Sequence, residues 1–269
     1  MNNWDDPAAA EYYEAFCRRH SRYIDANTAL VSRAAIRPGM QILDLGAGTG
    51  RTVEAVLPLA GPTGRIVCVE PFEAMKACGM RRVSDARVEW RCDLPEPPRG
   101  GPLGSAGFDR IVSGAAIWQL EPLEEWIRKL SDFLRPGGAL CFTVPAMNLC
   151  EPDEPGGGRD PLLLELLCLL CGGMAVSGAQ AAAKGWQMTR PALTTMLRRA
   201  HFRTQSWSFR HRLTQEAYSD WLKIPVLTER MFPGVDPAER ARRIDRALAG
   251  ADRDSWKWER WRGWTAWKH

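Results

Sequence analysis

Short apolar segments alternate with segments of helical pattern between Met40 and Val144, and few folds accept such an order of elements. Five of the apolar segments are predicted to be buried strands, at residues 40–45, 65–69, 88–92, 108–113 and 139–144. Helices are predicted between them at 49–57, 72–83 and 121–134, with a Pro/Gly-rich loop at 94–107. Apolar strands that alternate with helices form a parallel sheet covered on both faces. The chain is therefore predicted to be an α/β protein with a Rossmann-like, doubly wound sheet.

The segment before this core is predicted to be helical. Residues 1–36 are expected to form an N-terminal helical cap, in which Asp6 caps the helix and Pro7 occupies its first turn. Within the core, Pro122 is expected to open the helix at 121–134, and Gly137-Gly138 to close it.

The regular alternation ends at Pro145. Residues 149–185 are expected to form an inserted helical lid around a very apolar helix at 162–176, which is shorter than the roughly 18–20 residues that span a membrane. Residues 37–148 and 186–269 are assigned to the sheet domain, with a further helical insertion at 214–250. In this second part, helices are predicted at 189–200, 214–223 and 237–248 and strands at 202–213 and 258–268, the last with tryptophans that pack at the edge of the sheet.

One short motif points to a ligand site. Residues 44–50 read D-L-G-A-G-T-G, directly after the first predicted strand and before the first helix that follows it. The alternate glycines allow a sharp turn and leave no Cβ between the backbone and a ligand. In an open α/β sheet this position lies at the ligand crevice, so the loop is expected to form the floor of a cofactor site.

The spacing and charge of this motif argue against phosphate cofactors. A dinucleotide site has G-x-G-x-x-G, and here the third glycine comes one position too early. A P-loop is excluded because no G-K-[ST] follows. The carboxylate of Asp44 would repel a pyrophosphate and attract an ammonium or sulfonium group.

The motif resembles the glycine-rich loop of class I S-adenosylmethionine-dependent methyltransferases of the small-molecule type. Further segments match that family in order and spacing: Val69-Glu70-Pro71 after the second strand, residues 91–95 after the third, residues 113–119 after the fourth, and residues 134–139, L-R-P-G-G-A, before the fifth. The match covers residues 40–144 strongly and the rest of the chain weakly.

The resemblance implies S-adenosyl-L-methionine as cofactor and assigns roles to individual residues. Glu70 would accept hydrogen bonds from the two ribose hydroxyls, and Asp93 would accept one from the adenine amine. The residues expected to bind the cofactor are Asp44, Gly46, Ala47, Gly48, Gly50, Glu70, Pro71, Met75, Cys92, Asp93, Leu94, Ser113, Gly114 and Trp118.

The resemblance also completes the predicted fold. The family has a seven-stranded, mostly parallel sheet whose last strand is antiparallel and lies between strands five and six. The segment from Trp258 is the candidate for this strand, and it is expected to pair as a hairpin with the strand that begins at Phe202.

The acceptor side of the site is less defined by sequence. His20 is the first candidate for a general base, because the N-terminal helix of such enzymes often closes over the cofactor. Aromatic residues expected to contact the acceptor are Tyr12, Tyr13, Phe16, Trp118 and Trp221. A metal site is not predicted, since Cys168-x-x-Cys171 has no partner ligands nearby.

These features predict methyl transfer to an apolar or aromatic small molecule, as in specialised metabolism. Two alternatives stay open: another use of the same cofactor, such as intramolecular displacement or aminocarboxypropyl transfer, and a non-catalytic cofactor-binding module. A nucleic-acid methyltransferase acting on exocyclic amines is disfavoured, because residues 113–117 lack its [ND]-P-P-[FY] motif.

The composition of the chain indicates which partners and which cellular compartment to expect. The net charge of +4 is small and spread along the chain, which does not indicate a nucleic-acid partner. Residues 1–10 lack the pattern of a signal peptide, and the 8 cysteines are scattered as reduced thiols are. We therefore expect a cytoplasmic protein without a membrane partner, either a monomer or a homodimer.

Overall fold

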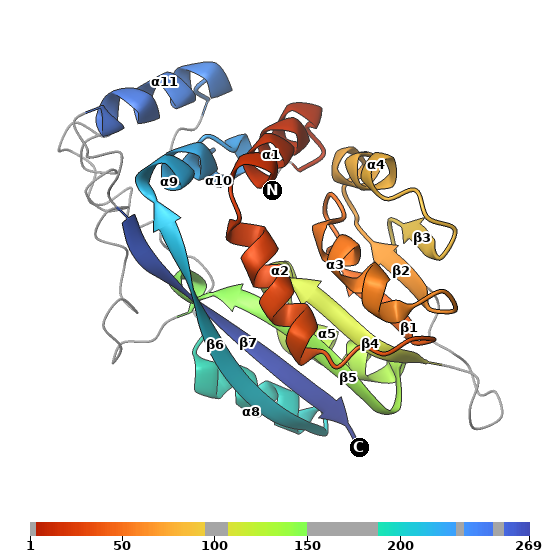
Figure 1. Ribbon diagram of the computed structural model, residues 1–269. Coiled ribbons are helices and arrows are strands. Elements are labelled where there is room, and N and C mark those ends of the chain that lie inside the picture. The colour runs from red at the N-terminus through yellow and green to blue at the C-terminus, as the bar shows by residue number, and fades with distance from the viewer. Residues whose placement is uncertain (1–3, 95–106, 150–187, 230–233, 250–255) are drawn as a thin grey trace.

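A seven-stranded mixed sheet forms the centre of the protein (Figure 1). The computed structural model describes residues 4–94, 107–149, 188–229, 234–249 and 256–269. The strands lie in the order β3-β2-β1-β4-β5-β7-β6. Their bounds are β1 (Gln41–Leu45), β2 (Arg65–Val69), β3 (Val88–Arg91), β4 (Phe108–Gly114), β5 (Leu134–Pro145), β6 (Phe202–Thr214) and β7 (Trp256–Lys268).

The directions of the strands confirm the predicted fold class. Strand β1 pairs in parallel with β2 and β4, and the parallel ladders continue to β3 and β5. Strand β7 is antiparallel to both of its neighbours, β5 and β6. The order reverses between β1 and β4, which creates the switch point at which open α/β sheets bind ligands.

Helices cover both faces of the sheet, as continuous apolar strands require. On one face, α2 (Arg22–Arg33) and α3 (Arg51–Ala60) pack onto Ile42, Ile66 and Val112. On the other face, α5 (Leu123–Phe133) and α8 (Arg190–Arg199) pack onto Leu43, Ile111 and Phe142. Within the described residues, the other α-helices are α1 (Pro7–Arg19), α4 (Glu73–Arg82), α9 (Gln215–Leu222), α10 (Pro225–Thr228) and α11 (Pro237–Leu248).

A third apolar cluster joins helices that are distant in sequence. Phe16 and Cys17 of α1 pack against Ile224 at the start of α10, and α1, α9 and α10 lie close together beyond one edge of the sheet (Figure 1). This edge carries the carboxyl ends of the parallel strands, so the cluster encloses the space above them.

The N-terminal segment differs from the single predicted helix, because it forms two helices that break at His20 and Ser21. His20 has extended backbone angles, φ −128° and ψ 138°, and its N–H still bonds to the carbonyl of Phe16. The break lets α2 lie in the core layer of the sheet while α1 packs with α9 and α10.

Two further local predictions were wrong. Helix α5 ends at Phe133, and Gly137 and Gly138 lie within β5 instead of closing the helix, because the chain pairs with Phe108 of β4 already at Leu134. The tryptophans of the last strand do not pack at an edge, because β7 lies between β5 and β6.

Two tryptophans of β7 instead pack on opposite faces of the sheet. Trp261 and Trp264 are fully buried and, three residues apart in a strand, point to opposite sides. Trp264 stacks on Phe142 with ring centroids 5.2 Å apart, and Trp261 stacks on Phe209 at 5.8 Å. The contact between Trp264 and Phe142 joins β7 to β5 of the parallel half, and the contact between Trp261 and Phe209 joins β7 to β6.

The predicted lid at 149–185, with its apolar helix at 162–176, lies outside the described residues apart from Leu149. The domain boundaries therefore stay predictions. Within the part of the chain that the structure describes, no helix is long and apolar enough to cross a membrane.

Candidate functional site

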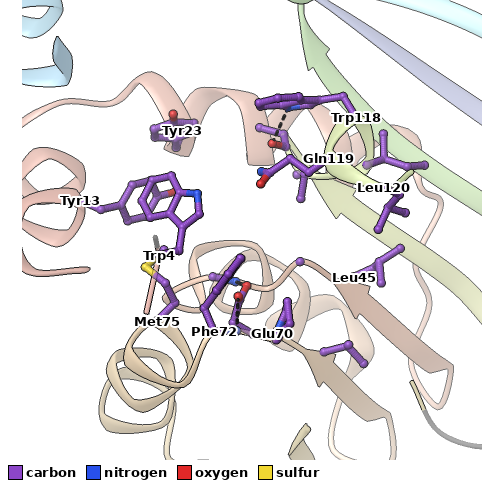
Figure 2. Close-up of a pocket in the computed structure, with 18 of the residues that line it drawn as sticks. Trp4, Tyr13, Tyr23, Leu45, Glu70, Phe72, Met75, Trp118, Gln119 and Leu120 are labelled. Carbon is purple, nitrogen blue, oxygen red and sulfur yellow. Dashed lines mark hydrogen bonds between the residues drawn. The ribbon is translucent and has the colours of Figure 1, made fainter. Parts of the chain in front are cut away.

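One cavity of about 520 Å³ opens at the carboxyl ends of the parallel strands (Figure 2). The last residues of four strands line it, namely Leu45, Val69, Gly114 and Pro145. The switch point between β1 and β4 therefore lies at the cavity, as expected for a ligand site in this sheet.

The glycine-rich loop forms one wall of the cavity, and its backbone requires glycine. Gly46, Gly48 and Gly50 have φ angles of 70°, 55° and 85°, in the left-handed region. A Cβ on Gly46 would lie 2.4 Å from the Cβ of Ala116, so no side chain fits there. Gly46 and Gly48 line the cavity, whereas Gly50 caps α3 and Ala47 is buried behind the wall.

Glu70 faces this loop from the end of β2. Its Oε2 accepts a hydrogen bond from the Gly48 N–H at 2.8 Å, and its Oε1 accepts one from the Phe72 N–H at 3.1 Å. Burial raises the pKa of Glu70 to about 7, although these two N–H groups act to lower it. The carboxylate is thus fixed in orientation, and each oxygen keeps a lone pair for a ligand.

Asp44 lies beneath the loop and is fully buried. Neither carboxylate oxygen has a hydrogen-bond partner. The buried hydroxyls of Thr49 and Ser113 also have none. Burial, with a smaller contribution from the charge of Glu70, raises the pKa of Asp44 to about 8. Asp44 and Ser113 do not line the cavity themselves. A buried carboxyl without a hydrogen-bond partner carries the cost of its desolvation without compensation.

This unpartnered carboxyl predicts a pH-dependent stability without ligand. The folded-state pKa of Asp44 exceeds the unfolded value, so its effect on stability becomes less favourable as pH rises from about 4 to about 8. Asp44→Asn removes the charge, and the ligand-free variant should be more stable than wild type by about 2 kcal/mol at pH 8. Urea unfolding at pH 5 and pH 8 measures this, and an equal difference at both pH values would contradict it.

The residues that follow β3 extend the wall formed by the glycine-rich loop. Cys92, Asp93 and Leu94 line the cavity there, and the side chain of Asp93 is exposed to solvent. Met75 of α4 lines the same wall, as does Pro71. Cys92 is held by α4, since Lys76 Nζ lies 2.8 Å from its Sγ.

Trp118 stands on the opposite wall, after β4. Its indole N–H donates to the carbonyl of Ala115 at 2.9 Å, which fixes the ring against the cavity. Gly114 also lines the cavity, and a Cβ on it would lie 2.5 Å from Oδ1 of Asn27 on α2.

Aromatic side chains from several elements enclose the other end of the cavity. We call this end the aromatic chamber, and it is formed by Trp4, Tyr13, Tyr23, Trp118 and Trp221. Trp4 meets Tyr13 edge to face at 5.8 Å, and Tyr13 lies 5.3 Å from Tyr23. Figure 2 shows Tyr13 and Trp4 across the cavity from Trp118, with Glu70 and Phe72 below them. Such a chamber suits a flat apolar group.

Polar contacts hold the N-terminal segment over the cavity. The Asp5 carboxylate accepts a hydrogen bond from the Glu73 N–H at 2.8 Å, at the start of α4. Glu14 of α1 pairs with Arg51 at 3.3 Å and also with Arg82. These contacts place Trp4 and Tyr13 in the wall.

The structure brings together most of the predicted ligand residues but not the predicted base. His20 is absent from the wall, and its Nε2 lies 2.9 Å from Oδ2 of Asp220 on α9. Phe16 is buried against Cys17 and Ile224, and Tyr12 is exposed at the surface. Of the predicted acceptor contacts, Tyr13, Trp118 and Trp221 lie in the wall.

Several residues of the cavity wall were not predicted from the sequence. Trp4 precedes the first predicted helix and Tyr23 lies within the predicted N-terminal helical segment, and neither was expected to line the site. Phe72 directly follows the predicted ribose-binding segment, and Gln119 and Leu120 directly follow Trp118. Their positions next to predicted site residues could have indicated that they line the cavity. Arg22 carried no signal, because its partner Glu259 is 237 residues away.

The charges of the wall decide which ligand chemistry fits. Arg22 is the one Lys or Arg side chain among the described residues that line the cavity, and Glu259 pairs with it at 2.5 Å. Glu70 and Asp93 add two carboxylates. A pyrophosphate would find no uncompensated cation among these residues, whereas a ligand with vicinal hydroxyls and a positive charge fits. The described residues contain no cluster of His, Cys, Asp and Glu that would hold a metal ion.

Comparisons with known proteins agree with this geometry. A family model described as "Methyltransferase domain" matches residues 43–140. Ubiquinone/menaquinone biosynthesis C-methyltransferase UbiE of Bordetella parapertussis is 30% identical over 125 residues, which cover 46% of this chain and 48% of that protein. The enzyme of the same name from Ralstonia nicotianae is 29% identical over 111 residues, covering 40% and 44%. The chain spans about half the length of the curated relatives it matches.

Solved structures share the fold over nearly the whole chain. The YcgJ protein of Bacillus subtilis aligns with a TM-score of 0.57 at 14% identity and covers 91% of this chain and 98% of its own. Phosphoethanolamine N-methyltransferase 2 of Haemonchus contortus, in complex with phosphomonomethylethanolamine and S-adenosylhomocysteine, aligns with a TM-score of 0.54 at 17% identity and covers 91% and 52%. At such identities the likeness concerns the fold alone.

Proposed function

We propose that the chain is a class I S-adenosylmethionine-dependent methyltransferase, which transfers the methyl group of S-adenosylmethionine to an apolar or aromatic small-molecule acceptor. One observation carries the proposal. A single cavity joins the wall made by the glycine loop and Glu70 to the aromatic chamber, so cofactor and acceptor would meet inside it.

The residues at the glycine-loop end fit this cofactor. Gly46 and Gly48 leave space against the backbone, and Glu70 presents an oriented carboxylate for two ribose hydroxyls. Asp93 and Leu94 line the same wall, and we assign the binding of the adenine to them. Burial raises the pKa of Asp44 behind the loop to about 8, so a nearby positively charged ligand would favour its ionised form, whereas a phosphate would disfavour that form further.

The cofactor supplies an already activated methyl group on a sulfonium. The chain must then align the acceptor with that methyl group and exclude water. Trp118 is suited to the first task, because its bond to Ala115 fixes the ring on the wall opposite Tyr13. Trp4 and Tyr13 serve the second, since Asp5 and Glu14 hold their segment over the cavity.

An aromatic acceptor is supported by the chamber and by the relatives. Its five aromatic rings offer apolar faces on several sides of a bound ring. The relatives that match residues of this chain at 30% and 29% identity are named as C-methyltransferases of ubiquinone and menaquinone biosynthesis, and ubiquinone and menaquinone are built on flat rings.

Titration calorimetry followed by product analysis tests the proposal. We expect S-adenosylmethionine and S-adenosylhomocysteine to bind and NAD not to bind. With a panel of phenols and hydroquinones as acceptors, mass spectrometry should then detect a product heavier by one CH2 together with S-adenosylhomocysteine. Binding of NAD, or failure of both sulfur nucleosides to bind, would refute the cofactor. Cleavage of the aminobutyrate chain without methyl transfer would favour another chemistry on the same cofactor.

A further inference from the structure

The hydroxyl of Tyr23 has an unusual set of neighbours in the aromatic chamber. Nη1 of Arg22 donates a hydrogen bond to this oxygen at 3.1 Å, and the indole N–H of Trp221 donates another at 3.1 Å. A phenolic oxygen has two lone pairs and one hydrogen. Both lone pairs are therefore in use, and the hydroxyl can form a further hydrogen bond only as a donor.

The two donors are themselves held in place. Arg22 is buried, and its Nε and Nη2 form a paired contact with the carboxylate of Glu259 at 2.8 and 2.5 Å. Its guanidinium also lies 4.5 Å from the ring centroid of Trp221. Because both partners are fixed, the oxygen of Tyr23 is fixed, and its hydrogen must point away from both of them.

The surroundings of that hydrogen indicate what it meets. Tyr23, Arg22 and Trp221 all line the cavity, and Tyr23 lies near Tyr13 and Trp4 on one side of it (Figure 2). The hydrogen bonds that the described residues make to this hydroxyl are the two donated ones. Tyr23 is half-buried, so in the open cavity this hydrogen faces solvent. A bound molecule that displaces water without offering an acceptor leaves the donor unpaired, which costs free energy, whereas a molecule with an acceptor atom avoids that cost.

We propose that Tyr23 is a specificity-determining residue, which selects an aromatic acceptor bearing a hydrogen-bond-accepting oxygen by donating its hydroxyl hydrogen to that oxygen. The inference rests on the proposed function and narrows it. The acceptor class is a neutral, flat ring with a carbonyl, phenolic or ether oxygen. Anionic acceptors are excluded from this class, because Glu259 already balances the charge of Arg22.

Binding of two matched probes tests this selection. The probes are the ketone 1-acetylnaphthalene and the hydrocarbon 1-isopropylnaphthalene, which have similar shapes and differ in the accepting oxygen. Quenching of tryptophan fluorescence is followed with protein loaded with S-adenosylhomocysteine. Wild type is expected to bind the ketone about tenfold more tightly, as one buried hydrogen bond would give. Tyr23→Phe keeps the ring and should bind both probes equally.

Tyr218→Phe serves as the matched control. Tyr218 is a buried tyrosine of α9 that stacks on the same Trp221 at 6.0 Å but does not line the cavity. Its variant should keep the tenfold preference for the ketone. Loss of the preference in this variant would show that packing around Trp221, and not the hydroxyl of Tyr23, causes it, and would overturn the proposal.

Further outcomes separate this inference from the proposed function. If Tyr23→Phe keeps the preference while S-adenosylhomocysteine still binds, the role of Tyr23 is refuted and the cofactor assignment stands. If S-adenosylhomocysteine does not bind to wild type, the proposed function fails, and with it this inference. Should Tyr23→Phe not fold, equal binding of both probes by wild type refutes the inference. If Tyr23→Phe does not fold, Trp221→Phe supplies a second test, because it frees one lone pair of the Tyr23 hydroxyl. The affinity for 1-naphthol, divided by the affinity for the ketone, should then be higher in Trp221→Phe than in wild type. No increase in this ratio would also refute the inference.

Discussion

Glu70→Gln is expected to weaken S-adenosylhomocysteine binding by about 100-fold at pH 8, the largest functional loss we predict for a single substitution. The carboxylate accepts one backbone N–H on each oxygen, from Gly48 and from Phe72. An amide has only one oxygen, so its NH2 group would face one of these N–H donors. The variant also loses the charge that strengthens hydrogen bonds from the ribose hydroxyls. Titration calorimetry measures the change.

The same carboxylate predicts how binding depends on pH. Binding through two accepted hydrogen bonds requires ionised Glu70, and its pKa is about 7 in the ligand-free protein. Affinity of wild type should therefore fall about tenfold for each pH unit below 7. In Glu70→Gln this slope should disappear, and any remaining dependence near pH 8 belongs to Asp44.

Glu89→Gln provides the control for the loss of one carboxylate. Glu89 lies on β3, its side chain is 58% exposed, and it pairs with Arg91 away from the cavity wall. Its variant should bind S-adenosylhomocysteine as wild type does at every pH. An equally tight complex with Glu70→Gln would contradict the ribose role of Glu70.

The fold could be predicted from sequence because its signals are local. Apolar strands, the glycine loop at 44–50 and the L-R-P-G-G-A segment each depend on neighbouring residues, and the predicted strands agree with the observed ones within a few residues at most ends. The antiparallel place of β7 followed from the family resemblance, and its register with β5 confirms it.

The acceptor end could not be predicted in the same way, because long-range contacts build it. The break at His20 and Ser21 contains neither Gly nor Pro, so no local signal marks it. Once the chain turns there, His20 meets Asp220 across 200 residues, and Arg22 meets Glu259 across 237. These pairings decide that Tyr23 and Arg22 face the cavity and that His20 does not.

The buried pair of Arg22 and Glu259 predicts the largest loss of stability. Burial alone would raise the pKa of Glu259, but the charge and hydrogen bonds of Arg22 outweigh it, and the pKa lies below its ordinary value. Glu259→Ala leaves a buried guanidinium without its carboxylate, which should cost about 4 kcal/mol. For a chain of this size the melting temperature should fall by about 10 °C, which differential scanning calorimetry measures.

Two further variants show whether the buried, unpaired charge causes the loss of stability in Glu259→Ala. Glu89→Ala breaks a pair whose side chains are 43% and 58% exposed, and it should cost less than about 1 kcal/mol. Arg22→Met combined with Glu259→Leu removes both charges and should recover most of the stability lost in Glu259→Ala. If the double variant is no more stable than Glu259→Ala, then lost packing and not the unpaired charge explains the effect.

The pH dependence of the unfolding free energy gives an independent measure of how much the pair of Arg22 and Glu259 stabilises the protein. Because the folded-state pKa of Glu259 is lowered, its contribution to stability is present above its unfolded pKa, near 4.5, and is lost as pH falls through the folded value. The difference in unfolding free energy between wild type and Glu259→Ala should therefore become smaller in acid.

Since Arg22 also donates to Tyr23, Glu259→Ala should reduce the ketone preference of the chamber as well, and the double variant should not restore it. Recovery of stability without recovery of selectivity would separate the structural role of this pair from its role in orienting Tyr23.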